Sequence, residues 1–206
     1  VRAASEGSEV NLANCHPFAS GRYLLMHNGH IGAFGKIRRK LLEGLDDEAF
    51  HLVKGSTDSE HLFAAFMSEL RNGGHTFVDG PDGGAGARAL GRALDAALAR
   101  VLAIVRESGA WEGSFLNVAV TDGVRAVVSR YTDHEENPET LYLLVDEIYE
   151  PVGRRFAERR PGDEGPSAVI SSERLTEDER WAPVPAGSMV LLDRWSEPTI
   201  LPLSMA

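Results

Sequence analysis

Apolar residues recur every three or four positions in three stretches of the sequence, which is the spacing of an amphipathic helix. The first stretch is residues 34–45. The second follows a capping box at residues 57–60, with Thr at the cap and Glu three positions later, and ends at Asn72-Gly73-Gly74. The third runs through residues 90–105, after a glycine-rich segment at 80–86. We therefore expect three helices, of which the last two are long and form one layer.

Short apolar runs bounded by turn residues indicate strands in the rest of the sequence. An early run, residues 23–26, leads into His27-Asn28-Gly29, which reads as a turn. Asp122-Gly123 predicts a two-residue hairpin loop, and residues 134–139 and 159–167 read as surface loops. The later strands are expected at residues 114–121, 124–130, 140–145, 168–171, 188–193 and 199–203.

The order of these elements predicts the fold class. Helices grouped together, followed by strands in hairpins, favour an α+β layered domain over a parallel doubly wound sheet. We see no internal repeat and no convincing linker, so we expect a single domain over residues 1–206.

Composition and charge exclude several classes of partner. The sequence is 43% hydrophobic and 25% charged, and its formal net charge is -10, which disfavours non-specific binding to nucleic acid or to anionic lipid. No apolar run approaches the ~18 residues of a membrane span. The single cysteine, Cys15, excludes an intrachain disulfide and fits a reducing compartment. We expect a cytoplasmic protein that acts on a small molecule.

Four standard sites can be set aside. The glycine-rich segment lacks the Lys-Ser/Thr of a nucleotide P-loop, and no Gly-x-Ser-x-Gly elbow occurs. His16, His27 and His30 match no standard zinc spacing, so we expect no metal site. Cys15 and His16 are adjacent and point in opposite directions if extended, so they are poorly placed to share a proton.

Polar motifs within the first 60 residues are the remaining candidates for chemistry. Each has a structural interpretation when taken alone: a surface charge, a plain turn or a helix cap. In sequence order they are Arg-x-x-Ser at residues 2–5, Asn-x-His-Pro-Phe at 14–18, His-Asn-Gly at 27–29 and Thr-Asp-Ser-Glu at 57–60.

Together and in this order the motifs resemble the class II glutamine amidotransferases, which belong to the N-terminal nucleophile hydrolases. The later sequence is similar to the stand-alone members of that family, including the γ-glutamyl hydrolases, so the resemblance covers nearly the whole chain. That similarity lies in residues 116–123, 129–131, 141–142 and 171–176 and at Trp181.

The resemblance implies a four-layer αββα sandwich and a site for glutamine or a γ-glutamyl compound. Arg2 resembles the arginine that binds the substrate carboxylate in bidentate fashion, and Ser5 lies where a hydroxyl adds a hydrogen bond. Asp58 resembles the acid that receives the α-ammonium, at a helix N-terminus that favours negative charge. Asn28 and Gly29 resemble the oxyanion hole. No cofactor is implied, and residues 16–18 are expected to support the site.

One departure from the family is serious. The family's nucleophile is a cysteine at the mature N-terminus, whose α-amine serves as the base, whereas residue 1 here is Val1 and Cys15 lies inside a motif. We expect the sequence to be part of a longer protein, inactive alone, which hydrolyses the γ-amide through a cysteinyl thioester. If a protein partner accepts the ammonia, the protein is a transferase subunit. The alternatives are a non-catalytic glutamine-binding or scaffold module, and an unrelated α+β domain.

Overall fold

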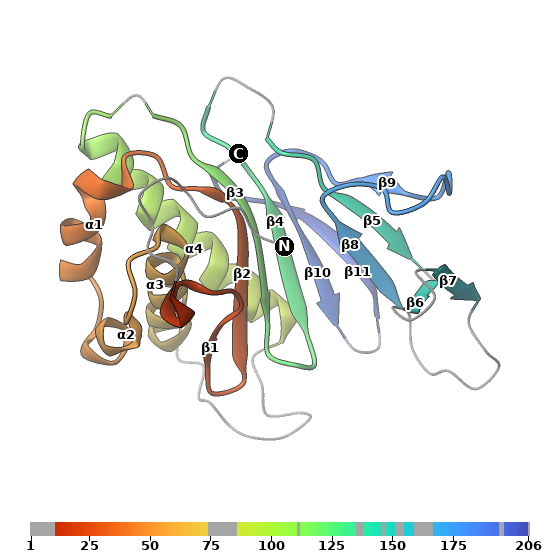
Figure 1. The fold of residues 1–206 in the computed structure, drawn as a ribbon, viewed down its shortest axis with the longest axis horizontal. Coiled ribbons are helices and arrows are strands. Elements are labelled where there is room, and N and C mark those ends of the chain that lie inside the picture. Colours follow the sequence, from red (N-terminus) through yellow and green to blue (C-terminus); the bar gives the residue numbers. More distant parts are fainter. Residues whose placement is uncertain are drawn as a thin grey trace.

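The computed structural model in Figure 1 describes residues 11–73, 86–110, 112–134, 138–145, 147–150, 155–158, 167–193 and 196–205. Its helical elements are η1 (Leu12–Asn14), α1 (Phe34–Glu43), α2 (Asp47–Leu52), α3 (Asp58–Asn72) and α4 (Ala87–Glu107). Its strands are β1 (Phe18–Ser20), β2 (Tyr23–His30), β3 (Phe115–Thr121), β4 (Ala126–Arg130), β5 (Tyr142–Val145), β6 (Glu147–Glu150), β7 (Arg155–Glu158), β8 (Ala168–Ser171), β9 (Ala182–Pro183), β10 (Ser188–Asp193) and β11 (Ser196–Pro202).

The largest sheet has six strands in the order β1-β2-β3-β4-β10-β11, and every neighbouring pair is antiparallel. Side chains alternate between its two faces, so Tyr23, Leu25 and His27 of β2 are buried on one face while Leu24 and Met26 are exposed on the other. This alternation decides on which side of the sheet each site residue of β2 lies.

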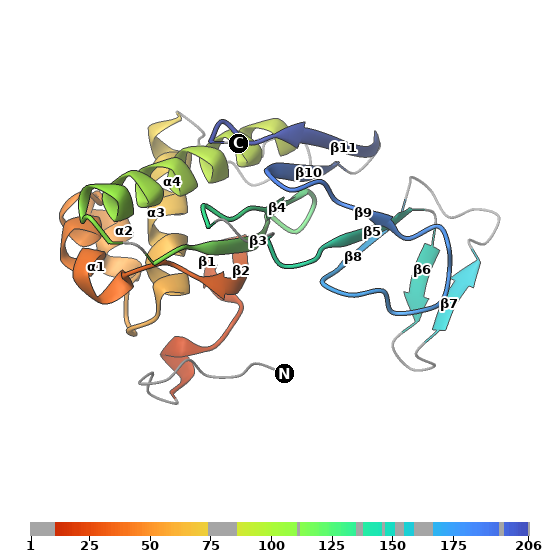
Figure 2. The same cartoon turned by 90° about the horizontal axis from the view of Figure 1, so that it is seen from above.

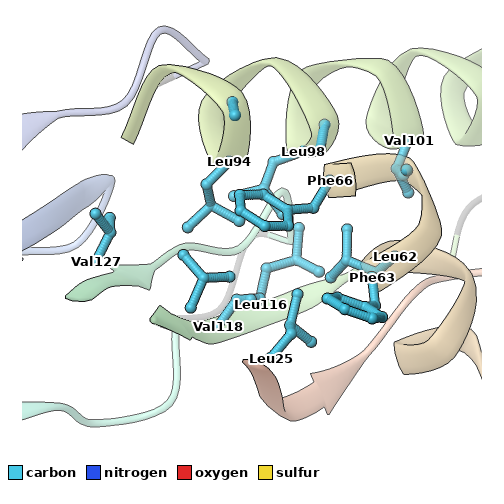
Figure 3. Close-up of a cluster of buried hydrophobic side chains, with 14 of the residues drawn as sticks. Leu25, Leu62, Phe63, Phe66, Leu94, Leu98, Val101, Leu116, Val118 and Val127 are labelled. Carbon is cyan, nitrogen blue, oxygen red and sulfur yellow. The ribbon is translucent and has the colours of Figure 1, made fainter. Parts of the chain in front are cut away.

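Helices α3 and α4 cover the buried face of this sheet. In Figure 3, Phe66, Leu94 and Leu98 from the helices lie against Leu25 and Val118 from the strands. Each of these five side chains is completely excluded from solvent. Burial of one such side chain stabilises the fold by about 1.5–3 kcal/mol. Packing against α3 and α4 therefore holds β2 firmly in place.

The opposite face of the sheet carries a second, smaller core. Val128 and Val190 of the large sheet pack with Leu141, Leu143 and Val184, which belong to or adjoin the three-stranded sheet β8-β5-β9. Figure 2 shows the helices at one end of the molecule and the small sheets at the other. The succession of helices, large sheet and small sheet confirms an α+β fold with antiparallel sheets; a second helical layer is not among the described residues.

Several sequence-based predictions need correction. Residues 27–29 do not form a turn: they lie inside β2 and pair with residues 116–118 of β3. The Asp122-Gly123 hairpin is real, but its loop has four residues, because Thr121 pairs with Ala126. Helix α2 and strands β1, β6, β7 and β9 were not predicted. Most of the glycine-rich segment and most of the predicted loop at 159–167 lie outside the described residues.

Candidate functional site

The end of β2 carries the predicted oxyanion residues. Asn28 points to the face opposite His27 and is exposed. Within the described residues its side-chain amide has no hydrogen-bond partner. An exposed Asn amide without a described partner can donate hydrogen bonds to solvent or to a ligand.

Gly29 adopts a backbone conformation that only glycine tolerates. Its φ is +140°, and a Cβ built on it would lie 1.9 Å from the Phe115 carbonyl oxygen and 2.7 Å from the carbonyl carbon. Both distances are far inside van der Waals contact. A glycine is therefore required here by the backbone angle and by the close approach of β3.

The backbone N–H of Gly29 points away from β3. The N–H of Leu116 donates to Tyr131 on the β4 side, at 2.8 Å, and Leu116 is the residue opposite Gly29. In an antiparallel ladder the non-bonded pair turns its polar groups outward, so the Gly29 N–H faces the side on which β1 lies. Strand β1 ends its pairing at Phe18, opposite Leu25. No described strand therefore covers the Gly29 N–H.

Asp58 is the first residue of α3 and lies next to the end of β2. One carboxylate oxygen, Oδ2, accepts a hydrogen bond from the Ile31 N–H at 2.9 Å. The other, Oδ1, accepts from the N–H of Ser59 at 2.7 Å. The partial positive charge of the helix N-terminus stabilises a carboxylate in this position. Because Ile31 follows Gly29 by two residues, one junction holds the two donors and the acid.

His27 and Ser59 form a buried link inside that junction. The His27 ring is 9% exposed and Ser59 is 2% exposed. His27 Nδ1 lies 3.0 Å from Ser59 Oγ, and Nε2 lies 3.0 Å from the Phe115 carbonyl oxygen. The link thus connects the strand that carries Asn28 to the helix that carries Asp58.

The segment before α3 is fixed by two buried side chains. Glu60 accepts hydrogen bonds from the N–H groups of Lys54 and Gly55 at 2.7 Å and 2.8–2.9 Å. Asn14 accepts from the Ser56 N–H at 2.9 Å. The capping-box prediction is confirmed for Thr57, whose hydroxyl accepts from the Glu60 N–H at 3.3 Å, while the Glu60 carboxylate binds the preceding segment.

A second buried histidine, His61, lies in the first turn of α3 and links this helix to α1. Its Nε2 accepts from Arg38 Nε at 3.1 Å, and its Nδ1 lies 2.7 Å from the Thr57 carbonyl oxygen. Burial lowers the pKa of His61, and the Arg38 charge lowers it further. Its geometry is that of a neutral imidazole that donates to Thr57, which is a structural role.

A hollow of about 440 Å³ is lined by residues of α1 and by one residue of α2, and it contains none of the predicted site residues. Its lining residues are Gly35, Arg38, Arg39, Leu42, Glu43 and Phe50. Arg39 is paired with Glu43, and Arg38 is bound to His61. We therefore place the candidate site at the end of β2 and not at this hollow.

Cys15 has the wrong surroundings for the family's nucleophile. Its backbone nitrogen is a peptide N–H that donates to Leu12 at 3.1 Å, so it offers no free amine as a base. Its sulfur lies 3.4 Å from the Asn11 carbonyl oxygen.

Within the described residues no three His, Cys, Asp or Glu side chains are grouped as metal ligands. Nor is any described helix long and apolar enough to cross a membrane.

Two predicted site residues, Arg2 and Ser5, lie outside the described residues. The structure brings Asn28, Gly29 and Asp58 to one junction. Sequence reasoning assigned no role to His27 or Ser59, although both lie within the quoted motifs. The junction offers two donors for an oxygen that gains negative charge and a carboxylate for a cation.

Comparison with known proteins points in the same direction. The model of a family described as glutamine amidotransferases class-II matches residues 1–199. The probable glutamine amidotransferase DUG3 of Saccharomyces cerevisiae is 34% identical over 94% of this chain, and the chain spans about half, 56%, of that protein.

Two solved structures are similar to this chain. A glutamine aminotransferase class-II domain protein from Silicibacter pomeroyi shares 27% identity with a TM-score of 0.65, covering 95% of this chain and 74% of that one. A predicted glutamine amidotransferase from Pseudomonas aeruginosa shares 19% identity with a TM-score of 0.58, covering 90% of this chain and 64% of that one. The second likeness concerns the fold alone.

Proposed function

The chain belongs to the class II glutamine amidotransferases, and on this premise we propose that it binds glutamine or a γ-glutamyl compound for hydrolysis of the γ-amide. The observation that carries this proposal is the junction of β2 and α3. There the Asn28 side-chain amide and the Gly29 N–H have no hydrogen-bond partner among the described residues. The Asp58 carboxylate binds the N–H of Ile31, two residues after Gly29.

The roles of the site residues follow from the charges of the substrate. Asp58 receives the α-ammonium, because a carboxylate with two fixed N–H donors keeps lone pairs for a third partner. Arg2 binds the α-carboxylate with its planar fork, and Ser5 adds a hydrogen bond. Asn28 and Gly29 donate to the γ-carbonyl oxygen, and the loss of one such donor costs about 100- to 1,000-fold in rate.

The reaction proceeds through a cysteine thiolate other than Cys15. The thiolate attacks the γ-carbonyl carbon, and the carbonyl oxygen becomes an oxyanion held by Asn28 and Gly29. The C–N bond then breaks, ammonia leaves with the proton taken from the thiol, and a thioester remains. Water attacks the thioester, releasing the γ-carboxylate and restoring the thiol. We propose that residues 1–206 act as one domain within a four-layer sandwich.

Calorimetry tests the binding site directly. Glutamine titrated into the purified chain should bind, and Asp58→Asn should weaken binding at least tenfold, because the ammonium loses a charged partner worth about 1.5–3 kcal/mol. Asp47→Asn is the matched control, since Asp47 is an exposed acid in the first turn of another helix, α2. If the wild-type chain does not bind glutamine, the proposal is wrong.

A turnover assay separates the enzyme from the binding module. The full-length protein should release glutamate and ammonia from glutamine, and Asn28→Ala should lower kcat about 100-fold or more. Glutamine binding without any product favours the non-catalytic module. Glutamate formed without an equal amount of free ammonia indicates transfer to a partner protein.

A further inference from the structure

His27 and Ser59 link the two halves of the candidate site, and we infer that they are positioning residues that hold Asp58 ready for the substrate ammonium. This inference rests on the proposed function. The contacts form an unbroken chain: the Phe115 carbonyl, His27, Ser59 and Asp58 follow one another at 3.0, 3.0 and 3.2 Å. The chain spans β3, β2 and α3.

The donors and acceptors in this chain limit where the hydrogens can lie. The Phe115 carbonyl can only accept, so His27 Nε2 carries a hydrogen and donates it. In the neutral imidazole, Nδ1 is then an acceptor. The Ser59 hydroxyl lies 3.0 Å from this nitrogen and has a single hydrogen. That hydrogen has two acceptors within reach, His27 Nδ1 at 3.0 Å and Asp58 Oδ1 at 3.2 Å, and the shorter contact assigns it to His27.

This competition matters for substrate binding. With the hydroxyl turned to His27, Asp58 Oδ1 keeps only the Ser59 N–H at 2.7 Å, and a lone pair stays available for an ammonium. Without His27 Nδ1, the hydroxyl turns to Asp58 and occupies the second lone pair of Oδ1, which leaves the ammonium only the remaining lone pair of Oδ2. The second ring nitrogen has a separate task, because its bond to Phe115 holds β3 beside Gly29.

Two substitutions of His27 separate these tasks. His27→Gln places an amide N–H near the position of Nε2 and loses the contact with Ser59. His27→Asn keeps a polar atom near the position of Nδ1 and loses the contact with Phe115. Ser59→Ala removes the hydroxyl alone. Ser68→Ala is the matched control, a serine of the same helix that is equally buried, at 2% exposed.

Three ligands report on the two ends of the substrate: glutamine, glutaramate, which lacks the α-ammonium, and norvaline, which lacks the γ-amide. By calorimetry, His27→Gln should weaken glutamine about tenfold and leave glutaramate unchanged. His27→Asn should weaken glutamine and glutaramate equally and leave norvaline unchanged. Ser59→Ala returns the Oδ1 lone pair and removes the competitor, so it should restore glutamine binding in the His27→Gln background.

The outcomes that overturn the inference are distinct from failure of the proposed function. If His27→Gln weakens glutamine and glutaramate alike, or if Ser59→Ala fails to restore binding while Ser68→Ala behaves as the wild type, the two residues are structural only. Thermal melts of each variant show whether lost binding reflects lost folding, and the restored double variant is itself evidence of a folded site. A wild-type chain that binds none of the ligands overturns the proposed function as well.

Discussion

The substitution Gly29→Ala tests the close approach of two strands at the candidate site. A φ of +140° costs a residue other than glycine about 1–3 kcal/mol. The new Cβ would lie 1.9 Å from the Phe115 carbonyl oxygen, so β3 must shift, and forced repacking typically costs a further ~1–3 kcal/mol. We expect a loss of at least about 3 kcal/mol in the free energy of unfolding.

Urea unfolding followed by circular dichroism measures this loss, and a thermal melt should fall by about 6–12 °C for a chain of this length. Two other glycines separate the contributions. Gly21 has a φ of +56° and open space around its Cα, so Gly21→Ala should cost only about 1 kcal/mol. Gly35 lies in α1 with open space and an ordinary φ, so Gly35→Ala should stabilise by about 0.5–1 kcal/mol.

The result that refutes this reasoning is a Gly29→Ala variant no less stable than Gly21→Ala. The backbone angle alone would then account for the loss, and the Phe115 carbonyl would impose no restriction. The magnitude matters for the proposed site, because the Gly29 N–H can serve as the proposed oxyanion donor only while it keeps its direction.

Three further predictions concern the supports of the site. Asp46→Ala removes the cap of α2 and an ion pair with Arg71, and should cost about 1–2 kcal/mol in urea at pH 7. Burial raises the pKa of Asp46, but hydrogen bonds from Ala49 and Arg71 outweigh burial and lower the pKa to about 2 from 3.8. The difference in unfolding free energy between the wild type and Asp46→Ala should therefore be complete above pH 3.8 and shrink as the pH falls toward 2. A difference that stays constant in this range contradicts this account. Glu60→Gln replaces a buried carboxylate that accepts from two backbone N–H groups with a neutral amide, and should cost about 1.5–3 kcal/mol of stability, measured by a thermal melt. Glu48→Gln, on the surface, should change stability by less than about 0.5 kcal/mol. Equal losses in the two variants contradict the argument from burial. Burial, with help from Arg38, lowers the pKa of His61 below 6.5. On lowering the pH, the unfolded chain therefore binds this proton before the folded chain does, and stability is lost as the pH falls below 6.5. His61→Gln should reduce the slope of the urea midpoint against pH in that range, and an unchanged slope refutes this.

Local patterns in the sequence were sufficient for the parts of the fold that depend on neighbouring residues. Thr57 caps α3 as predicted, because a hydroxyl three residues before a helical N–H is a short-range contact. Strands β8 and β10 have the predicted bounds, 168–171 and 188–193, since alternation and turn residues mark both ends. Helix α2 was missed because its six residues are too few to show a helical period.

Contacts between distant residues explain the errors. Asn28-Gly29 favours a turn locally, but pairing with β3 holds it in a strand. The Phe115 carbonyl, whose close approach requires a glycine at position 29, also contacts His27 and is 88 positions from it in the sequence. The hairpin loop is longer than predicted because the Asp122 carboxylate accepts from the N–H groups of Val124 and Arg125. The sequence resemblance supplied the candidate site residues, whereas the link through Ser59 could be found only from coordinates.

Asp58 has one observed role and one proposed role, and this changes how relatives of this protein should be compared. Its carboxylate ties α3 to the end of β2 through Ile31, so evolution would retain it in a paralogue that had lost its substrate. Retention of Asp58 is therefore weak evidence of activity in a homologue. Asn28, whose side chain makes no hydrogen bond to the described part of the chain, is under no such structural constraint. Under the proposed function, the loss of Asn28, and not the loss of Asp58, should be the earliest genetic mark of a relative that no longer cleaves amides.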